Sequence, residues 1–128
     1  MDKKQEEMTK LKVKILTRYL IMAAEDKRFV SYAEIVKLLD IPLQKSGQFA
    51  GLVGDCCLKN KLPYVNALII SREGIPGEDW FTWYKENNLC PEDAVFEVEW
   101  CKVIASCIKT FHLKQDKKQK YSNTKKVK

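Results

Sequence analysis

Histidine is almost missing from this sequence of 128 residues, which contains only His112. A cysteine or serine nucleophile needs a base beside it, and zinc sites combine cysteine and histidine at short, regular spacings. The five cysteines show no Cys-x-x-Cys spacing, and the five glycines are scattered rather than gathered in a phosphate-binding loop. We therefore predict a protein that is not an enzyme and that needs no metal and no cofactor.

Long hydrophobic runs are also missing. The longest, Tyr19 to Ala24, has six residues, whereas a helix needs about 20 to cross a bilayer. The charged start of the chain is not followed by the apolar stretch of a signal peptide. Five cysteines, an odd number, argue against a disulfide framework. These absences predict a cytoplasmic protein that does not interact with membranes.

Excess positive charge is confined to the end of the chain. Residues 1–111 contain 16 Lys and Arg and 16 Asp and Glu, so this part is neutral. Residues 112–128 contain seven Lys and one Asp and show no apolar periodicity. We expect a folded domain over residues 1–111 and a disordered basic tail over 112–128. Lys117, Lys118 and Lys120 of this tail would attract polyphosphates, and the alternative is a tail that serves only solubility.

Two segments have the apolar spacing of long amphipathic helices. The first, residues 5–24, carries a stripe formed by Met8, Leu11, Ile15, Tyr19 and Met22, and Leu16, Leu20 and Ala23 widen this stripe. The face opposite this stripe bears Lys10, Lys14 and Arg18, which either is simply solvated or contacts phosphate. The second helix is expected to start at Pro91, and its stripe is formed by Phe96, Trp100, Val103, Cys107 and Phe111. We expect both stripes to complete the core, the alternative being a homodimer interface on the C-terminal helix.

The stretch from Phe29 to Gly77 predicts two short helices. Ser31 and Glu34 have the spacing of a capping box at the start of the first helix, and Pro42 follows its end. Ser46 is expected to cap the second helix, which continues to Asn60.

A β-hairpin is expected after these helices. Residues 64–70 are rich in β-branched side chains, and residues 71–77 form a cluster of turn residues. The predicted fold is therefore α+β and mostly helical: a winged helix-turn-helix with a small β-hairpin and an added C-terminal helix.

Residues 30–36 (Val-Ser-Tyr-Ala-Glu-Ile-Val) resemble the start of a helix in the DNA-binding domain of alkylguanine-DNA alkyltransferases and alkyltransferase-like proteins. Residues 51–56 (Gly-Leu-Val-Gly-Asp-Cys) are similar to the next helix of that family, and residues 69–77 (Ile-Ile-Ser-Arg-Glu-Gly-Ile-Pro-Gly) to its wing. The likeness covers residues 29–77 and implies a winged-helix domain that binds DNA.

This sequence departs from the alkyltransferase family at two places. The family's nucleophile lies in a Pro-Cys-His-Arg segment, but the corresponding interval here, Tyr64–Ala67, has neither Cys nor His. The family's arginine that replaces a flipped base in the duplex corresponds to Gly51. The resemblance therefore implies the scaffold without alkyl transfer, and it argues against base flipping and against selective binding of alkylated bases.

Candidate contacts to DNA lie at the turn and along the second helix of the pair. The turn and the helix N-terminus present Gln44, Lys45, Ser46 and Gln48. Lys59 and Lys61 close this helix, and Arg72 lies at the tip of the predicted wing, so all three are expected to contact phosphate. Double-stranded DNA is the expected partner.

The alternative function is that of a protein-interaction module of the phage or mobile-element type, which modulates a host nucleic-acid enzyme. It is suggested by the neutral body and by the most aromatic stretch, a short helix over residues 78–84. The aromatic residues of this helix, Trp80, Phe81, Trp83 and Tyr84, cannot all lie on one side. We expect them to pack in the core or in a protein contact rather than to stack on bases.

Overall fold

The computed structural model describes the backbone of residues 2–126 and the side chains of residues 2–77 and 79–112. Its helices are α1 (Lys3–Glu25), α2 (Tyr32–Leu39), α3 (Leu43–Asn60), α4 (Glu78–Glu86) and α5 (Phe96–Lys126), with a 3-10 helix, η1 (Val65–Leu68). The strands β1 (Val30–Ser31) and β2 (Ile69–Ile70) form a small sheet. The prediction of a mostly helical α+β fold is confirmed.

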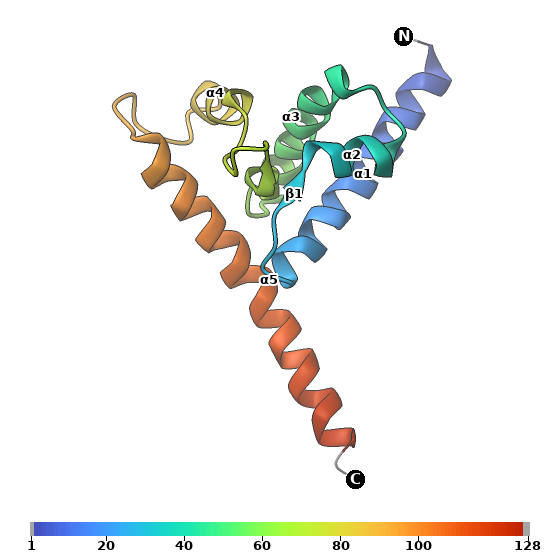
Figure 1. The fold of residues 1–128 in the computed structure, drawn as a ribbon, viewed down its shortest axis with the longest axis vertical. Coiled ribbons are helices and arrows are strands. Elements are labelled where there is room, and N and C mark those ends of the chain that lie inside the picture. Colours follow the sequence, from blue (N-terminus) through green and yellow to red (C-terminus); the bar gives the residue numbers. More distant parts are fainter. Residues whose placement is uncertain (1, 127–128) are drawn as a thin grey trace.

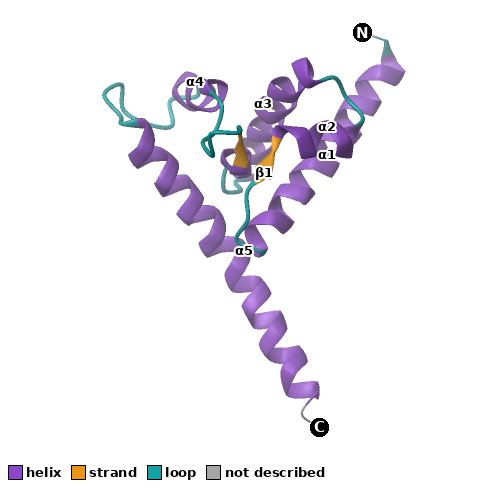
Figure 2. Cartoon of the chain, in the orientation of Figure 1, coloured by secondary structure: helices purple, strands orange, loops and turns teal. Residues whose placement is uncertain are grey.

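The two long helices form the arms of a V (Figure 1). The C-terminal end of α1 packs against α5 where the arms meet, and α2, α3 and η1 lie between them. The two strands lie near the centre of this arrangement (Figure 2). The sequence predicts a disordered tail from residue 112, whereas α5 keeps a helical backbone to Lys126. The side chains beyond His112 lie outside the described residues.

The predicted β-hairpin is wrong, because the two strands of the sheet are parallel and come from distant parts of the chain. Val30 pairs with Ile69, and Ser31 pairs with Ile70. The expected wing, residues 71–77, starts as a closed turn in which the Ser71 N–H donates to the carbonyl of Ile75 at 2.8 Å. The chain then enters α4, so no strand returns beside β2 in the part of the chain that the structure describes.

The segment predicted to be the first hairpin strand is mostly the 3-10 helix η1. All four of its residues are buried, and it packs against α1, α3 and α5. Because helices surround it, its backbone groups find partners nearby rather than on a neighbouring strand. Ala67 N–H donates to the carbonyl of Tyr64 at 3.1 Å, and the Trp100 indole N–H donates to the carbonyl of Ala67 at 2.9 Å.

The two predicted helix stripes have opposite outcomes. The stripe on α5 is confirmed. Val103, Cys107 and Phe111 are buried, and the first two residues of the stripe, Phe96 and Trp100, are half-buried. The stripe on α1 is wrong at its centre. The core side is formed by Leu16, Thr17, Leu20, Ala23 and Ala24, and so includes the three residues that were expected only to widen the stripe. Met8, Leu11, Ile15 and Met22 are instead exposed, because α1 has two apolar faces and the small alanines lie on the one that packs against its neighbours.

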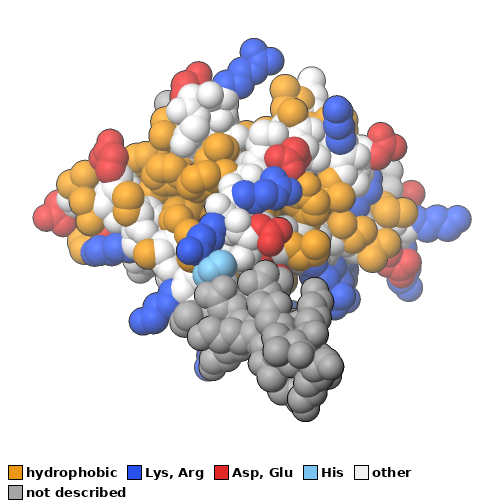
Figure 3. Space-filling model, turned by 60° about the horizontal axis from the view of Figure 1, so that its bottom comes forward, with side chains coloured by type: hydrophobic (Ala, Val, Ile, Leu, Met, Phe, Trp, Pro, Cys, Tyr) orange, Lys and Arg blue, Asp and Glu red, His pale blue; other side chains and the backbone are white. Residues whose placement is uncertain are grey.

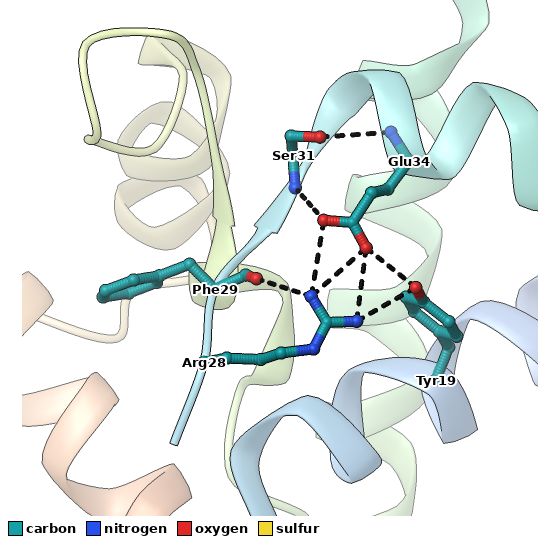
Figure 4. A network of polar contacts seen from close by, with 5 residues as sticks. All are labelled: Tyr19, Arg28, Phe29, Ser31 and Glu34. Carbon is teal, nitrogen blue, oxygen red and sulfur yellow. Dashed lines mark hydrogen bonds and ion pairs between the residues drawn. The ribbon is translucent and has the colours of Figure 1, made fainter. Parts of the chain in front are cut away.

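The predicted capping box at the start of α2 is confirmed, and it belongs to a larger polar network (Figure 4). The Ser31 hydroxyl accepts from the Glu34 N–H at 3.1 Å. The Glu34 carboxylate accepts from the Ser31 N–H at 3.3 Å, from the Tyr19 hydroxyl at 2.7 Å and from the Arg28 guanidinium at 3.2 Å. This network ties α1 to β1 and α2 near the surface.

Two other predicted helix starts are wrong. The N-cap of α3 is Pro42 rather than Ser46, which lies inside the helix with its hydroxyl donating to the carbonyl of Leu43 at 2.6 Å. Pro42 suits this place because a helix start does not use its missing N–H. Pro91 starts a turn, closed by the Ala94 N–H at 3.1 Å, and α5 begins only at Phe96.

The first four α-helices end in the same way. The residues that follow them have positive φ angles and are Lys27, Asp40, Lys61 and Asn88. In each case the next N–H donates back to a carbonyl in the last helical turn, as the Leu62 N–H does to Cys57 at 2.9 Å. This is the Schellman arrangement, although glycine occupies none of the four positions.

Candidate nucleic-acid interface

Helix α3 has one side open to solvent. It packs against α1, α2, η1 and α4, and buries Phe49, Val53 and Cys57 among them. Its exposed residues are Leu43, Gln44, Lys45, Gln48, Asp55, Lys59 and Asn60. The helix that the sequence predicts to face DNA is therefore partly accessible, and it presents two lysines and one carboxylate.

Two grooves lie along the line where α1 and α3 pack, and Thr9 contributes to both. We call these two grooves together the α1–α3 seam. The first, of about 340 Å³, brings Lys12 of α1 beside Lys45 and Gln48 of α3. Asp40, from the turn between α2 and α3, adds one carboxylate to this groove.

The second groove of the seam, of about 470 Å³, is lined by Lys10 and Lys14 of α1 and by Lys59 of α3. Its floor is apolar, with Val13, Leu52 and Cys56. Asp55 lies in this groove and accepts a hydrogen bond from the Trp83 indole N–H at 3.0 Å.

Charge along the seam is mainly positive. The two grooves together contain five lysines, Lys10, Lys12, Lys14, Lys45 and Lys59, and two carboxylates, Asp40 and Asp55. Isolated surface charges contribute little to binding, but several lysines along one line match the regular phosphates of a nucleic acid. The seam is therefore suited to an extended polyanion.

The predicted site residues fall into separate places. Lys45, Gln48 and Lys59 come together in the seam, and Gln44 is exposed at the start of α3. Ser46 is buried. Lys61 lines another groove, of about 520 Å³, with Tyr84 and Lys102.

The remaining predicted residues lie elsewhere. Arg72 is exposed in the turn after β2. Lys117, Lys118 and Lys120 are on the last part of α5, where side chains lie outside the described residues.

Sequence reasoning did not assign Lys12 to the site. For Lys10 and Lys14 it left two interpretations open, a solvated face or contacts to phosphate. In the structure all three line the seam beside α3. A signal existed in the alternation of lysine with other residues over positions 10–14. Its meaning depends on where α3 packs, which periodicity within α1 does not reveal.

The positions that correspond to the alkyltransferase nucleophile are not open to a substrate. Residues 65–68 form η1, which is buried throughout. The position of the duplex-entering arginine is different, because a Cβ added at Gly51 would have no atom within 4 Å. The scaffold thus has room for a side chain at Gly51 that this sequence lacks.

The aromatic stretch of α4 packs in the interior. Trp80 and Tyr84 are buried, and Phe81 and Trp83 are half-buried. The Trp80 indole N–H donates to the side-chain oxygen of Asn66 at 3.3 Å, and the Trp80 and Tyr84 rings stack at 4.9 Å. The sequence left two alternatives open for these rings, the core or a protein contact, and the contacts of Trp80 and Tyr84 are those of core residues.

The interior cysteines are poor candidates for chemistry. Burial raises the pKa of the Cys57 thiol to about 11 and that of Cys107 to about 12. Both thiols are therefore protonated near neutral pH, when only the thiolate would be reactive.

Among the described residues, no group of three or more His, Cys, Asp or Glu side chains could hold a metal ion. Within the same part of the chain, no helix is both long and apolar enough to cross a bilayer. No protein-family model, curated protein or solved structure matches this chain.

Proposed function

We propose that this protein binds double-stranded DNA without catalysing a reaction, with the α1–α3 seam facing the phosphates. The observation that carries the proposal is the convergence of five lysines from α1 and α3 along this seam. Phosphate contacts dominate the affinity of most DNA-binding proteins, and a seam that joins two helices can follow a backbone.

The order of elements adds support. α2 and α3 are joined by a turn of three residues, Asp40 to Pro42, and α3 exposes Gln44, Lys45 and Gln48 in its first turns. In a helix-turn-helix protein these first turns of the second helix contact base edges. The resemblance to the alkyltransferase DNA-binding domain covers the same pair of helices. The proposal uses no hairpin wing. The phosphate contacts that a wing would make are assigned to α1 instead.

The sharpest test compares two triple variants of equal charge. In the seam variant, Lys10, Lys14 and Lys59 are changed to Gln. In the control variant, Lys27, Lys37 and Lys109 are changed to Gln, because these lysines are exposed and none of them lines the seam. Binding of a fluorescent duplex of mixed sequence is measured by anisotropy over a series of salt concentrations.

We expect the seam variant to bind more weakly than the control at every salt concentration. The slope of log K against log salt should become shallower by about 0.9 for each phosphate contact that is lost. Two results would overturn the proposal. One is the absence of duplex binding by the wild type at low salt, and the other is an equal loss in both variants, which would show attraction by net charge alone.

A second candidate function, binding to a protein that acts on nucleic acids, is favoured by a row of aromatic rings at the surface. Phe29, which is 39% exposed, stacks on Trp100 at 5.8 Å, and Trp100 stacks on Phe96 at 6.1 Å. Phe96 and Phe81 line a groove of about 410 Å³. Val95 and Val98, 56% and 50% exposed, lie next to Phe96 in the chain. Aromatic and apolar side chains of this kind are enriched in protein interfaces.

A pulldown from cell extract separates this function from the first. Binding to a protein predicts recovery of one partner in constant ratio after nuclease treatment, and its loss in a Phe29→Asp variant. A partner that disappears with nuclease, or that Phe29→Asp still recovers in full, would contradict it.

A further inference from the structure

Helix α1 has a second apolar face, which points away from the core. Met8, Leu11, Ile15 and Met22 are 51%, 51%, 40% and 58% exposed. We call these four residues the outer stripe. They lie on the side of α1 opposite Leu20 and Ala24, which are fully buried. Figure 3 shows that hydrophobic side chains gather on one face of the molecule, among charged ones. Single exposed apolar residues are ordinary, but a row along about four turns of one helix indicates a contact surface.

The spacing of the outer stripe is that of a coiled-coil seam. Met8, Ile15 and Met22 are separated by seven residues each and occupy the a positions of a heptad repeat. Leu11 and Arg18 occupy the d positions between them. A partner for such a seam must repeat its hydrophobic positions with the same period. A second copy of α1 meets this requirement.

We propose that two copies of this chain pair through the outer stripes of their α1 helices, side by side and in parallel. The flanking charges select the orientation. Glu7 is at a g position and Lys12 at the following e position. In a parallel pair g residues lie beside e residues of the other helix, so two-fold symmetry forms two pairs between Glu7 and the Lys12 of the other copy.

An antiparallel pair would bring like charges together. In that orientation e positions face e positions and g positions face g positions. With Leu11 and Ile15 at the centre, Lys12 would lie beside the other Lys12, and Lys14 beside the other Lys14. Glu7 and Lys12 are also available, since the ion pairs of the described residues join only Arg28 to Glu34 and Lys102 to Glu99.

Arg18 limits the strength of this association. In the parallel pair its side chain lies beside the Arg18 of the other copy, although its long stem can cover apolar surface while the charged end reaches water. A charged residue at one core position of a coiled coil fixes the register and lowers the affinity. The pairing is therefore weak and reversible. It does not depend on the proposed DNA binding, although it shares Met8 and Lys12 with the first groove of the seam.

The test measures the association of the full chain by sedimentation equilibrium, without DNA. The wild type should dimerise in a concentration-dependent manner. Ile15→Glu should weaken the dimer by at least about a hundredfold, because it places two carboxylates in an apolar layer. Val98→Glu is the matched control: Val98 is an exposed apolar residue of α5, and its replacement should leave the dimer unchanged. Circular dichroism checks that both variants are folded.

Charge exchange tests the orientation. Glu7→Lys and Lys12→Glu should each weaken the dimer by about tenfold, and the double variant should restore it. Arg18→Leu should tighten it by about tenfold or more, because it completes the seam. A chain that stays monomeric even as Arg18→Leu would overturn the proposal. So would a dimer that Val98→Glu disrupts and Ile15→Glu does not, or a double variant that fails to restore the affinity.

Discussion

The part of the chain from residue 3 to 61 and the part from 62 to 101 differ in charge. The first, with α1, α2 and α3, contains twelve Lys and Arg against seven Asp and Glu. The second, with η1, β2, α4 and the start of α5, contains two Lys and Arg against eight Asp and Glu. We call them the basic region and the acidic region. The neutral balance of residues 1–111 therefore conceals two regions of opposite charge, and a polyanion should approach only the basic one.

The two regions are held together by specific contacts along α3. The Asn66 side chain, in η1, donates to the carbonyl of Ala50 in α3 at 3.2 Å and accepts from the Trp80 indole of α4 at 3.3 Å. α4 approaches α3 at Gly54, where a Cβ would lie 2.3 Å from the Trp83 ring. Substitutions at these contacts should show how far the stability of the basic region depends on its packing against the acidic region.

The largest effect is expected from Asn66→Ala. Asn66 is 3% exposed, and its removal leaves the Trp80 N–H and the Ala50 carbonyl without their partner inside the protein. Each buried group left unpaired costs about 1–3 kcal/mol, so the free energy of unfolding should fall by about 2–6 kcal/mol. Urea denaturation measures it, with Asn60→Ala as the control, since Asn60 is exposed. Equal losses in the two variants would show that Asn66 does not join the regions.

A smaller effect is expected from Gly54→Ala. The added methyl group would overlap the Trp83 ring and the Asn66 amide, which lies 2.5 Å from its position. Overpacking of this kind costs about 1–3 kcal/mol. The matched variant Gly51→Ala has no atom within 4 Å of its new Cβ and lies in the same helix. It should stabilise the protein by about 0.5–1 kcal/mol in thermal unfolding, because alanine favours helices. A change of the same sign in both variants would contradict the close packing at Gly54.

The smallest effect is expected within the basic region, at Glu34. Burial raises the pKa of its carboxyl group, but hydrogen bonds from Tyr19, the Ser31 N–H and Arg28 outweigh burial and lower that pKa below the ordinary value of 4.5. A lowered pKa means that the carboxylate stabilises the fold above about pH 4.5 and that this stabilisation is lost as the pH falls through the lower value.

Glu34→Gln keeps the side chain of the capping box and removes its charge. The wild type should be more stable than this variant by about 1 kcal/mol near neutral pH, and the difference should vanish in acid. Urea midpoints measured at several pH values test this prediction. A stability difference that does not change with pH would show that the charge of Glu34 makes no contribution.

The comparison of α1 with α5 shows how much of the fold could be predicted from the sequence. Both helices were predicted with apolar stripes, and the stripe of α5 packs inward as expected. On α1 the side chains of Leu11 and Leu20 lie on opposite faces, and both faces are apolar. Periodicity identifies a helix in such a case but not its inner side. That choice depends on the neighbours that the rest of the chain supplies.

Dependence on distant neighbours also explains why the strand pairing and part of the site were not predicted. Residues 69–70 are extended as β-branched residues should be, but their partner is β1, far away in the sequence, and no local pattern encodes that pairing. Lys45, Gln48 and Lys59 were found because they lie near the ends of a helix that the sequence delimits. Lys12 was missed because its place in the seam depends on the packing of α1 against α3.

The helix ends also bear on how stable this fold could become. Lys27, Asp40, Lys61 and Asn88 adopt a backbone conformation that costs a residue with a side chain about 1 kcal/mol more than glycine. Three of the five glycines lie instead within α3, at positions 47, 51 and 54, where they weaken the helix, and of these Gly47 and Gly54 allow α4 to come close. The natural sequence therefore lies below the maximum thermal stability of its own backbone. Replacement of these four helix-end residues by glycine is a direct route to a protein of higher thermal stability.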